Sequence, residues 1–144
     1  MTRDDVIREA RSWINTPWVH QASCKGVGAD CIGFGAGAAA ACGSADAVRF
    51  LSTPEWRSYG RQPDPAFLFS VCDQLMDRVP VIADALPGDM LLFSCGRHPM
   101  HFGFLAPAGR IIHSWLVARK VIEHALDDGW RARIVRVYRL RGVS

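Results

Sequence analysis

The chain has 144 residues, 49% of them hydrophobic and 22% charged, and its 17 basic and 14 acidic side chains give a formal net charge of +3. That length suits one compact domain, residues 1–144, and is too short for two. The charge is too small and too scattered to predict nucleic-acid binding, and no apolar run approaches the ~20 residues of a membrane-spanning helix.

The N-terminus and the cysteines bear on where the chain is made. Residues 1–5 are polar and acidic, and no apolar segment typical of a signal peptide follows them. Five cysteines are an odd number, which fits reduced thiols better than a disulfide framework. We therefore expect a chain synthesised in a cytoplasm without a signal peptide.

The first half of the chain has a helical pattern. Apolar residues recur at helical spacing over 6–14, and turn-forming residues predict an ordered loop over 15–29. Further helices are predicted at about 31–42 and 65–78. Between them, the polar and aromatic segment 44–63 is expected to be a surface excursion.

The second half changes to the two-residue alternation of strands. Clusters of glycine, proline and aspartate separate the alternating segments. Helices followed by a meander of strands predict an α+β domain, in which N-terminal helices pack on a five- to six-stranded antiparallel sheet. The predicted strands are 90–93, 101–105, 110–115, 119–124 and 132–140.

The second predicted helix contains three glycines at alternate positions, Gly33, Gly35 and Gly37. Each glycine costs about 1 kcal/mol relative to alanine in a helix interior. Such residues persist where another element must approach closely. We expect this helix to pack tightly against the sheet.

Cys31 stands at the predicted start of that helix, directly after Asp30. A helix N-terminus favours a thiolate, and its unpaired N–H groups can also stabilise an oxyanion. Asp30 is suited to capping the helix, and its own charge partly opposes thiolate formation. Without a base nearby, the simpler interpretation of Cys31 is a buried structural thiol.

A base is available from two histidines on consecutive predicted strands, His101 and His113. A hairpin loop with an odd number of residues places both rings on one face of the sheet, whereas a two-residue loop places them on opposite faces. Gly103 leaves room for another element to approach. We predict that the helix start lies over this face, with His101 taking the thiol proton and His113 orienting His101.

Four motifs in order resemble the NlpC-type cell-wall peptidases, a papain-like superfamily, over nearly the whole chain. That family's first helix, G-T-P-Y loop and D-C-x-G nucleophile turn are matched by A-R-S-W-I-N-T-P-W-V-H-Q-A-S-C-K-G-V-G-A-D-C-I-G-F. Its P-G-D strand is matched by L-P-G-D-M-L-L-F, its H-V-G-I strand with the base by H-F-G-F, and its third-residue strand by I-I-H-S-W.

The resemblance implies a papain-like fold and a cysteine peptidase. Cys31 is then the nucleophile, His101 the base and His113 the orienting residue, with no cofactor and no metal. The substrate that it implies is the peptidoglycan stem peptide, cut between D-γ-glutamate and a diamino acid through a thioester. One departure is Trp18, which replaces the family's tyrosine beside the active site and has no hydroxyl.

The loop residues Trp18 and His20 are candidate substrate-binding residues. Trp18 is either a stacking wall of the cleft or part of the core, and His20 either lines the cleft or serves a surface or capping role. His124, next to Glu123 on a predicted strand, is expected at the surface.

The stretches H-Q-A-S-x-K-G and V-I-E-H-A-L-D-D-G-W-R-A-R-I look most like the branch of the family found in phage and phage-like tail gene clusters, gene transfer agents included. This implies a chain carried to the wall in a phage-like particle tail, bound to tail-tip or hub proteins.

Three other interpretations are open, and one of them is acyl transfer by the same residues to an acceptor other than water. The chain could be a catalytically impaired structural or capping component of a tail tip, which the missing tyrosine hydroxyl favours. Cys95, His98 and His101 have a C-x2-H-x2-H spacing that could bind zinc, but Pro99 interrupts the stretch and no fourth ligand is evident.

Overall fold

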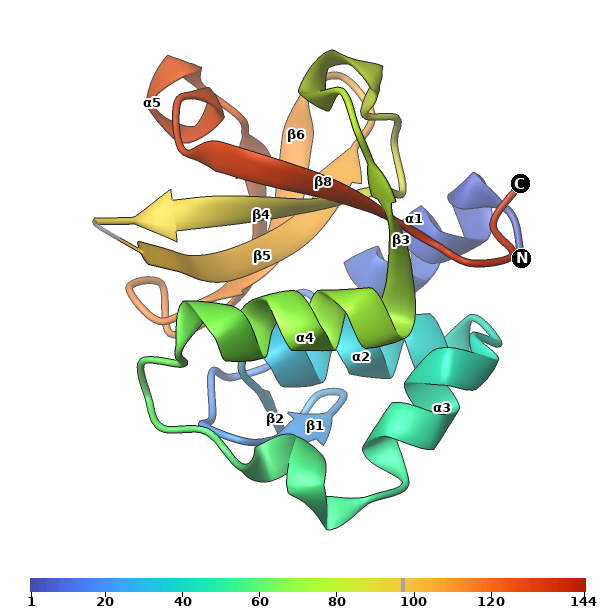
Figure 1. Ribbon diagram of the computed structural model, residues 1–144, viewed down its shortest axis with the longest axis vertical. Coiled ribbons are helices and arrows are strands. Elements are labelled where there is room, and N and C mark those ends of the chain that lie inside the picture. Colours follow the sequence, from blue (N-terminus) through green and yellow to red (C-terminus); the bar gives the residue numbers. More distant parts are fainter. Residues whose placement is uncertain (97) are drawn as a thin grey trace.

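The computed structural model describes residues 1–96 and 98–144, apart from the side chains at 95 and 98–100 (Figure 1). Its helical elements begin with a capped helix, since Thr2 and Asp5 form a reciprocal capping box at the N-terminus. The helices are α1 Arg3–Ser12, α2 Cys31–Ala41, α3 Ala45–Leu51, α4 Pro65–Leu75 and α5 Asp128–Arg131, with short 3-10 turns η1 Pro54–Arg57 and η2 Ile82–Asp84.

The strands form a small hairpin and one large sheet. The large sheet has six strands in the order β3-β8-β4-β5-β6-β7, and every neighbouring pair is antiparallel. The predicted α+β class is therefore confirmed. The strands are β1 Ser23–Cys24 and β2 Gly28–Ala29 in the hairpin, and β3 Met76–Val79, β4 Met90–Cys95, β5 His98–Ala106, β6 Arg110–Trp115, β7 Lys120–Ala125 and β8 Ile134–Leu140 in the sheet.

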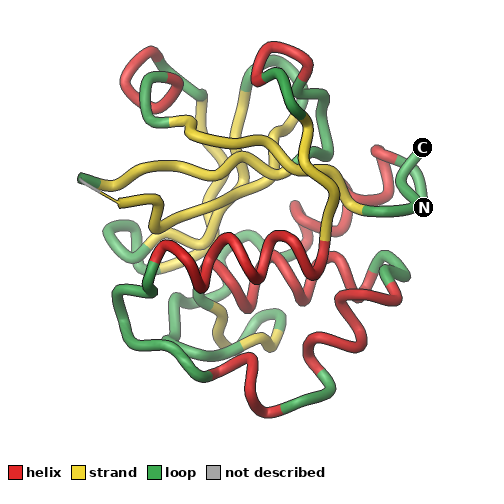
Figure 2. Tube along the Cα trace, in the orientation of Figure 1, coloured by secondary structure: helices red, strands yellow, loops and turns green. Residues whose placement is uncertain are grey.

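Two helices cover one face of the sheet. In Figures 1 and 2, α4 and α2 both lie beneath the strands, where each contacts β5, and the small β1–β2 hairpin lies below them. Phe34 of α2 meets Phe104 of β5 edge to face at 5.5 Å, and both rings are buried in the main apolar cluster. The chain ends also meet, because the Arg3 N–H donates to the Ser144 carbonyl at 3.2 Å.

The glycines of α2 are explained by close packing, as predicted, but against three different neighbours. A Cβ at Gly35 would lie 2.5 Å from the Phe102 ring of the sheet. One at Gly37 would lie 2.5 Å from the Trp13 ring, and one at Gly33 would lie 1.7 Å from a carbonyl oxygen of the preceding loop. No real Cβ fits at such distances, so α2 can approach its surroundings only with glycine at these positions.

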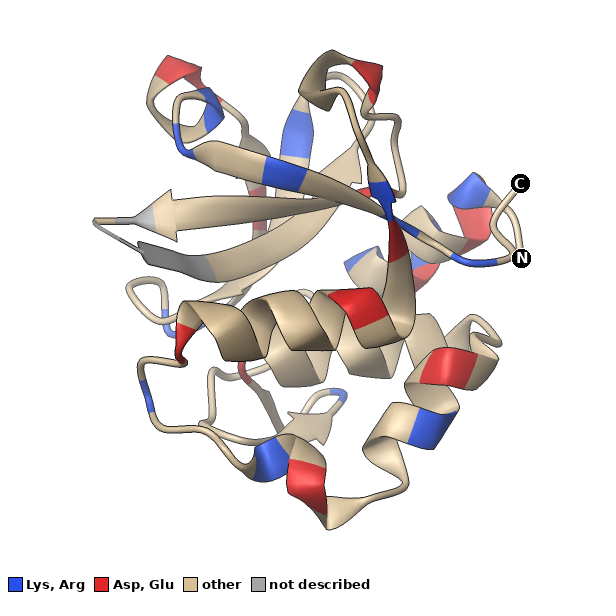
Figure 3. Ribbon diagram, in the orientation of Figure 1, with Lys and Arg blue, Asp and Glu red and all other residues tan. Residues whose placement is uncertain are grey.

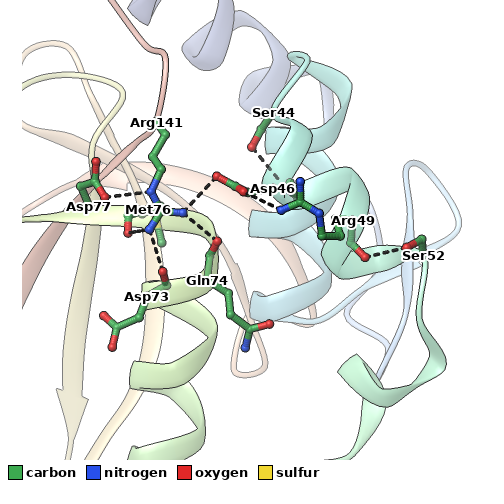
Figure 4. Close-up of polar contacts among 10 residues, drawn as sticks. Ser44, Asp46, Arg49, Ser52, Asp73, Gln74, Met76, Asp77 and Arg141 are labelled. Atoms are coloured by element: carbon green, nitrogen blue, oxygen red, sulfur yellow. Dashed lines mark hydrogen bonds and ion pairs between the residues drawn. The ribbon is translucent and has the colours of Figure 1, made fainter.

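The helix predicted over 65–78 ends earlier, and the last residues of that range form an edge strand. Arg141 explains the break (Figure 4): its guanidinium donates to the carbonyls of Asp73, Gln74 and Met76 at 2.8 to 3.0 Å. These groups lie where a helix end leaves carbonyls without partners. The chain beyond them pairs with β8 as β3.

The segment 44–63 is more ordered than the predicted surface excursion. Ser44 caps α3 by accepting a hydrogen bond from the Ala47 N–H at 3.2 Å. Phe50 and Trp56 are buried, and their rings pack 6.1 Å apart against the main core. The segment thus adds to the core, and it carries Tyr59 back toward the start of α2.

Charges of both signs are interspersed over the view in Figure 3, and neither sign gathers on one element there. Of the helices within the described residues, none has the length and apolar character needed to cross a bilayer.

A buried carboxylate, Asp89, ties three parts of the chain together. Arg139 of β8 binds it in a bidentate manner at 2.9 and 2.7 Å, and Arg3 of α1 donates to it at 2.9 Å. Burial raises the pKa of Asp89, but hydrogen bonds from Arg139, the Leu86 N–H and Arg3 outweigh it, and the net pKa lies below the ordinary value. The carboxylate is therefore charged and fully paired.

Replacing Asp89 with asparagine should destabilise the fold by about 3 kcal/mol, because both arginines lose their charged partner in a buried site. Asp77→Asn is the matched control. Its carboxylate also pairs with an arginine, Arg141, but its side chain is 71% exposed, so the loss should stay below about 1 kcal/mol. Urea unfolding of both variants measures the difference, and equal losses would contradict a special role for the buried site.

Candidate active site

The start of α2 is held by the carboxylate of Asp30. Its Oδ1 accepts from the Gly33 N–H at 2.8 Å, which caps the helix as predicted. Its Oδ2 accepts from the Gln21 N–H at 2.8 Å and from the Tyr59 hydroxyl at 2.5 Å. One carboxylate thus fixes the first turn of α2, and with it Cys31, to two separate loops.

The loop before α2 is anchored to the sheet. The Ser114 hydroxyl of β6, fully buried, donates to the Ala29 carbonyl at 2.7 Å. The Trp18 N–H donates to the Arg119 carbonyl at 2.9 Å, and the Ala29 N–H donates to the Pro17 carbonyl at 2.9 Å. The helix start therefore has a defined position relative to β6.

The hairpin of β5 and β6 has an odd loop, which is one of the two cases that the sequence leaves open. Ala106 pairs with Arg110, which leaves the three residues 107–109 as the loop. His101 and His113 therefore lie on the same face, as predicted for an odd loop. The ladder runs only from Ala106–Arg110 to Phe104–Ile112, so the two strands no longer pair where they carry the histidines.

The two rings are in direct contact. His101 Nε2 lies 2.5 Å from His113 Nδ1, and both residues are buried. Gly103 makes this possible, because a Cβ there would lie 2.7 Å from the Cβ of His113. The neighbour that Gly103 admits is thus the adjacent strand, not a separate element.

The body of α2 and the His101 side chain lie on opposite faces of the sheet. α2 packs on the face of Phe102 and Phe104, whereas His101 alternates with them and points the other way. The body of α2 therefore does not cover the histidine face, whereas the prediction concerned only the start of the helix. Cys31 and His101 nevertheless line the same pocket, at the place where β5 and β6 part.

This pocket has a volume of about 220 Å³. Among the described residues, the Cys31 thiol forms no hydrogen bond with the His101 ring, so both groups line the pocket but do not contact each other through a hydrogen bond. Hydrogen bonds of this kind often tighten only when substrate binds. The pocket is lined by Trp18, His20, Asp30, Cys31, Tyr59, Arg61, Gln62, Pro63, His101, Ser114, Trp115 and Leu116.

Cys31 is a thiol, not a thiolate, in this environment. Burial raises the pKa of the Cys31 thiol strongly, and the charge of Asp30 raises it further. The backbone N–H groups of Phe102 and Ile32 lower the pKa, but by less. The helix N-terminus therefore does not by itself produce a thiolate, and a base is needed to remove the proton.

Both histidines are neutral near pH 7. Burial lowers the pKa of His101 to about 4, with a smaller effect of the charge on His124. Burial also lowers the pKa of His113, to about 2, with further effects of His101 and His124. A neutral imidazole with a free ring nitrogen is the form that can accept the thiol proton.

The predicted substrate-binding residues lie on the pocket wall. Trp18 is half-buried and stacks against His20 with ring centroids 6.3 Å apart, so it is a wall residue and not part of the core. His20 Nδ1 lies 4.0 Å from Asp30 Oδ2. Their placement fits contact with a ligand, and their role in binding stays a prediction.

Tyr59 is a pocket residue that the sequence pattern does not identify. It comes from the segment after η1, and its hydroxyl donates to Asp30. Burial and then the negative charge of Asp30 raise the pKa of Tyr59, so it remains a donor. The resemblance in sequence implies a tyrosine at position 18, where this chain has Trp18, but the Tyr59 hydroxyl enters the same pocket from the segment after η1.

His124 and Trp130 are the other residues that were missed. His124 is not a plain surface residue, because its Nε2 lies 2.8 Å from His113 Nε2. Trp130 of α5 packs against His101, His113 and His124, with ring centroids 6.3, 5.1 and 5.4 Å away. The same-face position of His124 follows from the pairing of β6 with β7, which the sequence leaves undetermined.

The alternative zinc site involves side chains outside the described part of the chain, at Cys95 and His98. His101, its third member, makes its ring contact with His113 instead. Within the described residues, no group of three or more potential ligands could hold a metal ion.

The fold is similar to that of NlpC/P60 domains, as the sequence motifs predict. An NlpC/P60 family protein from Bacillus cereus superposes with a TM-score of 0.67 and 19% identity, over 97% of this chain and 40% of that one. The NlpC/p60 domain of the peptidoglycan hydrolase SagA gives 0.62 and 18%, over 97% of this chain and all of that one.

A third similar structure carries a different enzyme name. An N-acetylmuramoyl-L-alanine amidase from Bacteroides uniformis gives a TM-score of 0.67 at 10% identity, over 96% of this chain and 98% of that one. The sequence itself matches no family model and no curated protein. At these identities the comparisons show the fold.

The buried neutral histidines predict a loss of stability in mild acid. The unfolded chain binds protons on histidine below about pH 6.5, while His101 resists protonation until about pH 4. The free energy of unfolding should therefore keep its highest value above about pH 6.5 and should fall as the pH drops toward 4.

His101→Gln is the control for this effect, because it removes one of the titrating rings. Urea titrations at pH 7, 5.5 and 4.5 should show a shallower decline in this variant than in the wild type. Parallel declines would contradict the depressed pKa of His101.

Proposed function

We propose that this chain is a cysteine peptidase that hydrolyses an amide bond in the stem peptides of bacterial peptidoglycan. The observation that carries the proposal is the pocket whose wall is shared by Cys31, at the start of α2, and by His101, which contacts His113. The four sequence motifs and the likeness in fold to a domain named as a peptidoglycan hydrolase support the same class of enzyme.

The reaction uses one proton acceptor in both of its halves. His101 takes the proton of the Cys31 thiol while the sulfur attacks the amide carbonyl carbon. The C–N bond then breaks, the amine leaves with the proton from His101, and the acyl group stays on sulfur as a thioester. Water attacks the thioester and gives its proton to His101, which returns it to sulfur as the carboxylic acid departs.

The developing oxyanion needs hydrogen-bond donors. The backbone N–H groups in the first turn of α2 have no partner within the helix. The Gly33 N–H is already used, because it donates to Asp30, and the others can serve the oxyanion. The Tyr59 hydroxyl already donates to Asp30, so its single proton is not available to the oxyanion. We therefore assign oxyanion binding to the backbone at the helix start, and to Tyr59 the positioning of Asp30.

The pocket lining fits a peptide with carboxylate groups. Trp18, His20 and Trp115 offer flat aromatic surfaces, and the exposed Arg61 offers a guanidinium at the rim. Guanidinium groups bind carboxylates in a bidentate manner, and stem peptides carry several carboxylates. The finer assignment, cleavage between D-γ-glutamate and a diamino acid, rests on the sequence resemblance alone.

A catalytically impaired structural component is the second candidate. Trp18 in the place of the family tyrosine favours it. The raised pKa of the Cys31 thiol points the same way, because the thiolate is the reactive form. The contact between His101 and His113 favours the enzyme, because a purely structural protein has no chemical need for a paired base.

Delivery to the wall is a separate proposal. The tail-branch resemblance of two sequence stretches supports a chain synthesised in the cytoplasm and carried by a phage-like tail, with tail-tip or hub proteins as partners.

Digestion of purified peptidoglycan tests the enzymatic proposal. The wild type should release fragments, and Cys31→Ala should reduce the rate by at least about 10³-fold, because the nucleophile is lost. Cys24→Ala, the same change at an exposed cysteine, should leave the rate unchanged. Mass spectrometry of the fragments identifies the bond that is cut.

Fragments that persist in Cys31→Ala would exclude Cys31 as nucleophile. A wild-type chain that binds peptidoglycan and releases nothing would favour the structural candidate. Fragments cut at another amide would leave the class of enzyme intact and correct the bond.

Purification of phage-like particles from the source bacterium tests delivery. Mass spectrometry should detect the chain in the particles, at a fixed ratio to tail proteins across density-gradient fractions. Finding it only in the free cytosolic pool would contradict a tail component.

A further inference from the structure

Three imidazole rings form a continuous row behind the pocket. His101 Nε2 lies 2.5 Å from His113 Nδ1, and His113 Nε2 lies 2.8 Å from His124 Nε2. The row ends on the backbone, where His124 Nδ1 lies 2.8 Å from the carbonyl oxygen of Ala125. His101 lines the pocket, whereas His113 and His124 do not.

The carbonyl at the end of the row determines the direction of every hydrogen bond in it. A carbonyl oxygen can only accept, so His124 carries its proton on Nδ1, and neutral His124 accepts at Nε2. His113 must then donate from Nε2, which leaves its Nδ1 as an acceptor. His101 in turn donates from Nε2 to His113.

The consequence for His101 is a lone pair on Nδ1. With its proton on Nε2, neutral His101 has Nδ1 free, and that nitrogen is the one that can take the thiol proton of Cys31. If the row ran in the opposite direction, His113 would donate from Nδ1, and His101 would hold its proton on Nδ1. In that tautomer His101 could not accept the proton.

The surroundings keep the row intact. Trp130 packs against all three rings, and Trp115 stacks on His113 at 5.6 Å. His113 is fully buried, so water does not compete for its ring nitrogens. In such a setting the direction of the hydrogen bonds depends on the groups at the two ends of the row.

We propose that His124 is a positioning residue that sets the tautomer of His113 and, through it, that of His101. This inference deepens the proposed function and rests on it, since His101 is the base of that reaction. His124 touches neither the substrate pocket nor the sulfur, and it acts by accepting a hydrogen bond and by its own bond to the Ala125 carbonyl.

Three substitutions at His124 separate this role from packing. His124→Gln can place an amide oxygen near the former Nε2 and keeps an acceptor for His113. His124→Phe keeps an aromatic ring beside Trp130 but has no acceptor. His124→Lys provides only donors and forces His113 to accept, which is the wrong direction.

We expect the wild type to have the highest kcat and His124→Gln to lie within about 3-fold of it. His124→Phe should have a kcat about 10-fold or more below the wild type, and His124→Lys should have the lowest. KM should change little, because His124 lies outside the pocket. A packing role predicts a different order, with phenylalanine above glutamine. That order, or equal rates for phenylalanine and lysine in folded variants, would overturn the proposal.

Nitrogen-15 NMR of the imidazole rings provides a readout that does not require turnover. In the wild type and in His124→Gln, the His101 ring should be protonated at Nε2 and unprotonated at Nδ1. In the lysine variant the proton should move to Nδ1. A wild-type His101 with its proton on Nδ1 would overturn the tautomer assignment.

The two proposals can fail independently. If Cys31→Ala abolishes hydrolysis but the His124 variants keep wild-type rates, the enzyme stands and the role of His124 falls. If the wild type hydrolyses nothing while the NMR tautomers change as expected, the hydrogen-bonded row stands and the proposed function falls.

Discussion

Cys31 and His101 come from opposite faces of the sheet, and they line one pocket near the place where the β5–β6 ladder ends before it reaches the histidines. α2 covers the face of Phe102 and Phe104, while His101 points away from it. Gly103 lets the His113 side chain lie close against β5, and this close approach brings the His101 and His113 rings into contact at the pocket.

Burial and charge leave this site neutral at rest. Burial and Asp30 keep the Cys31 proton on sulfur, and burial keeps His101 uncharged. Two neutral groups can react only if the acceptor nitrogen faces the thiol, so the tautomer of His101 decides whether the pair is competent. Asp30 has two opposing effects on Cys31. Its hydrogen bonds fix the start of α2 and therefore the position of Cys31, but its negative charge disfavours the Cys31 thiolate.

Local patterns predicted α1, α2, most of α4, the strand meander and the tight packing of α2. These patterns missed the features that depend on residues far away in the sequence. One such feature is β3, which forms because β8 pairs with it and because Arg141 binds the carbonyls at the end of α4. Tyr59 reaches the pocket through the packing of α3 and η1, which no local signal reveals. His124 was missed because the length of the β6–β7 turn decides which face it occupies.

The central claim is that Cys31 carries the acyl group during hydrolysis with His101 as its base. Acid quenching during turnover of peptidoglycan, followed by peptide mass spectrometry, tests it most directly. The account predicts a stem-peptide adduct on the peptide that contains Cys31, absent in His101→Gln. Active turnover with that peptide always unmodified, or with the adduct on another cysteine, would contradict it.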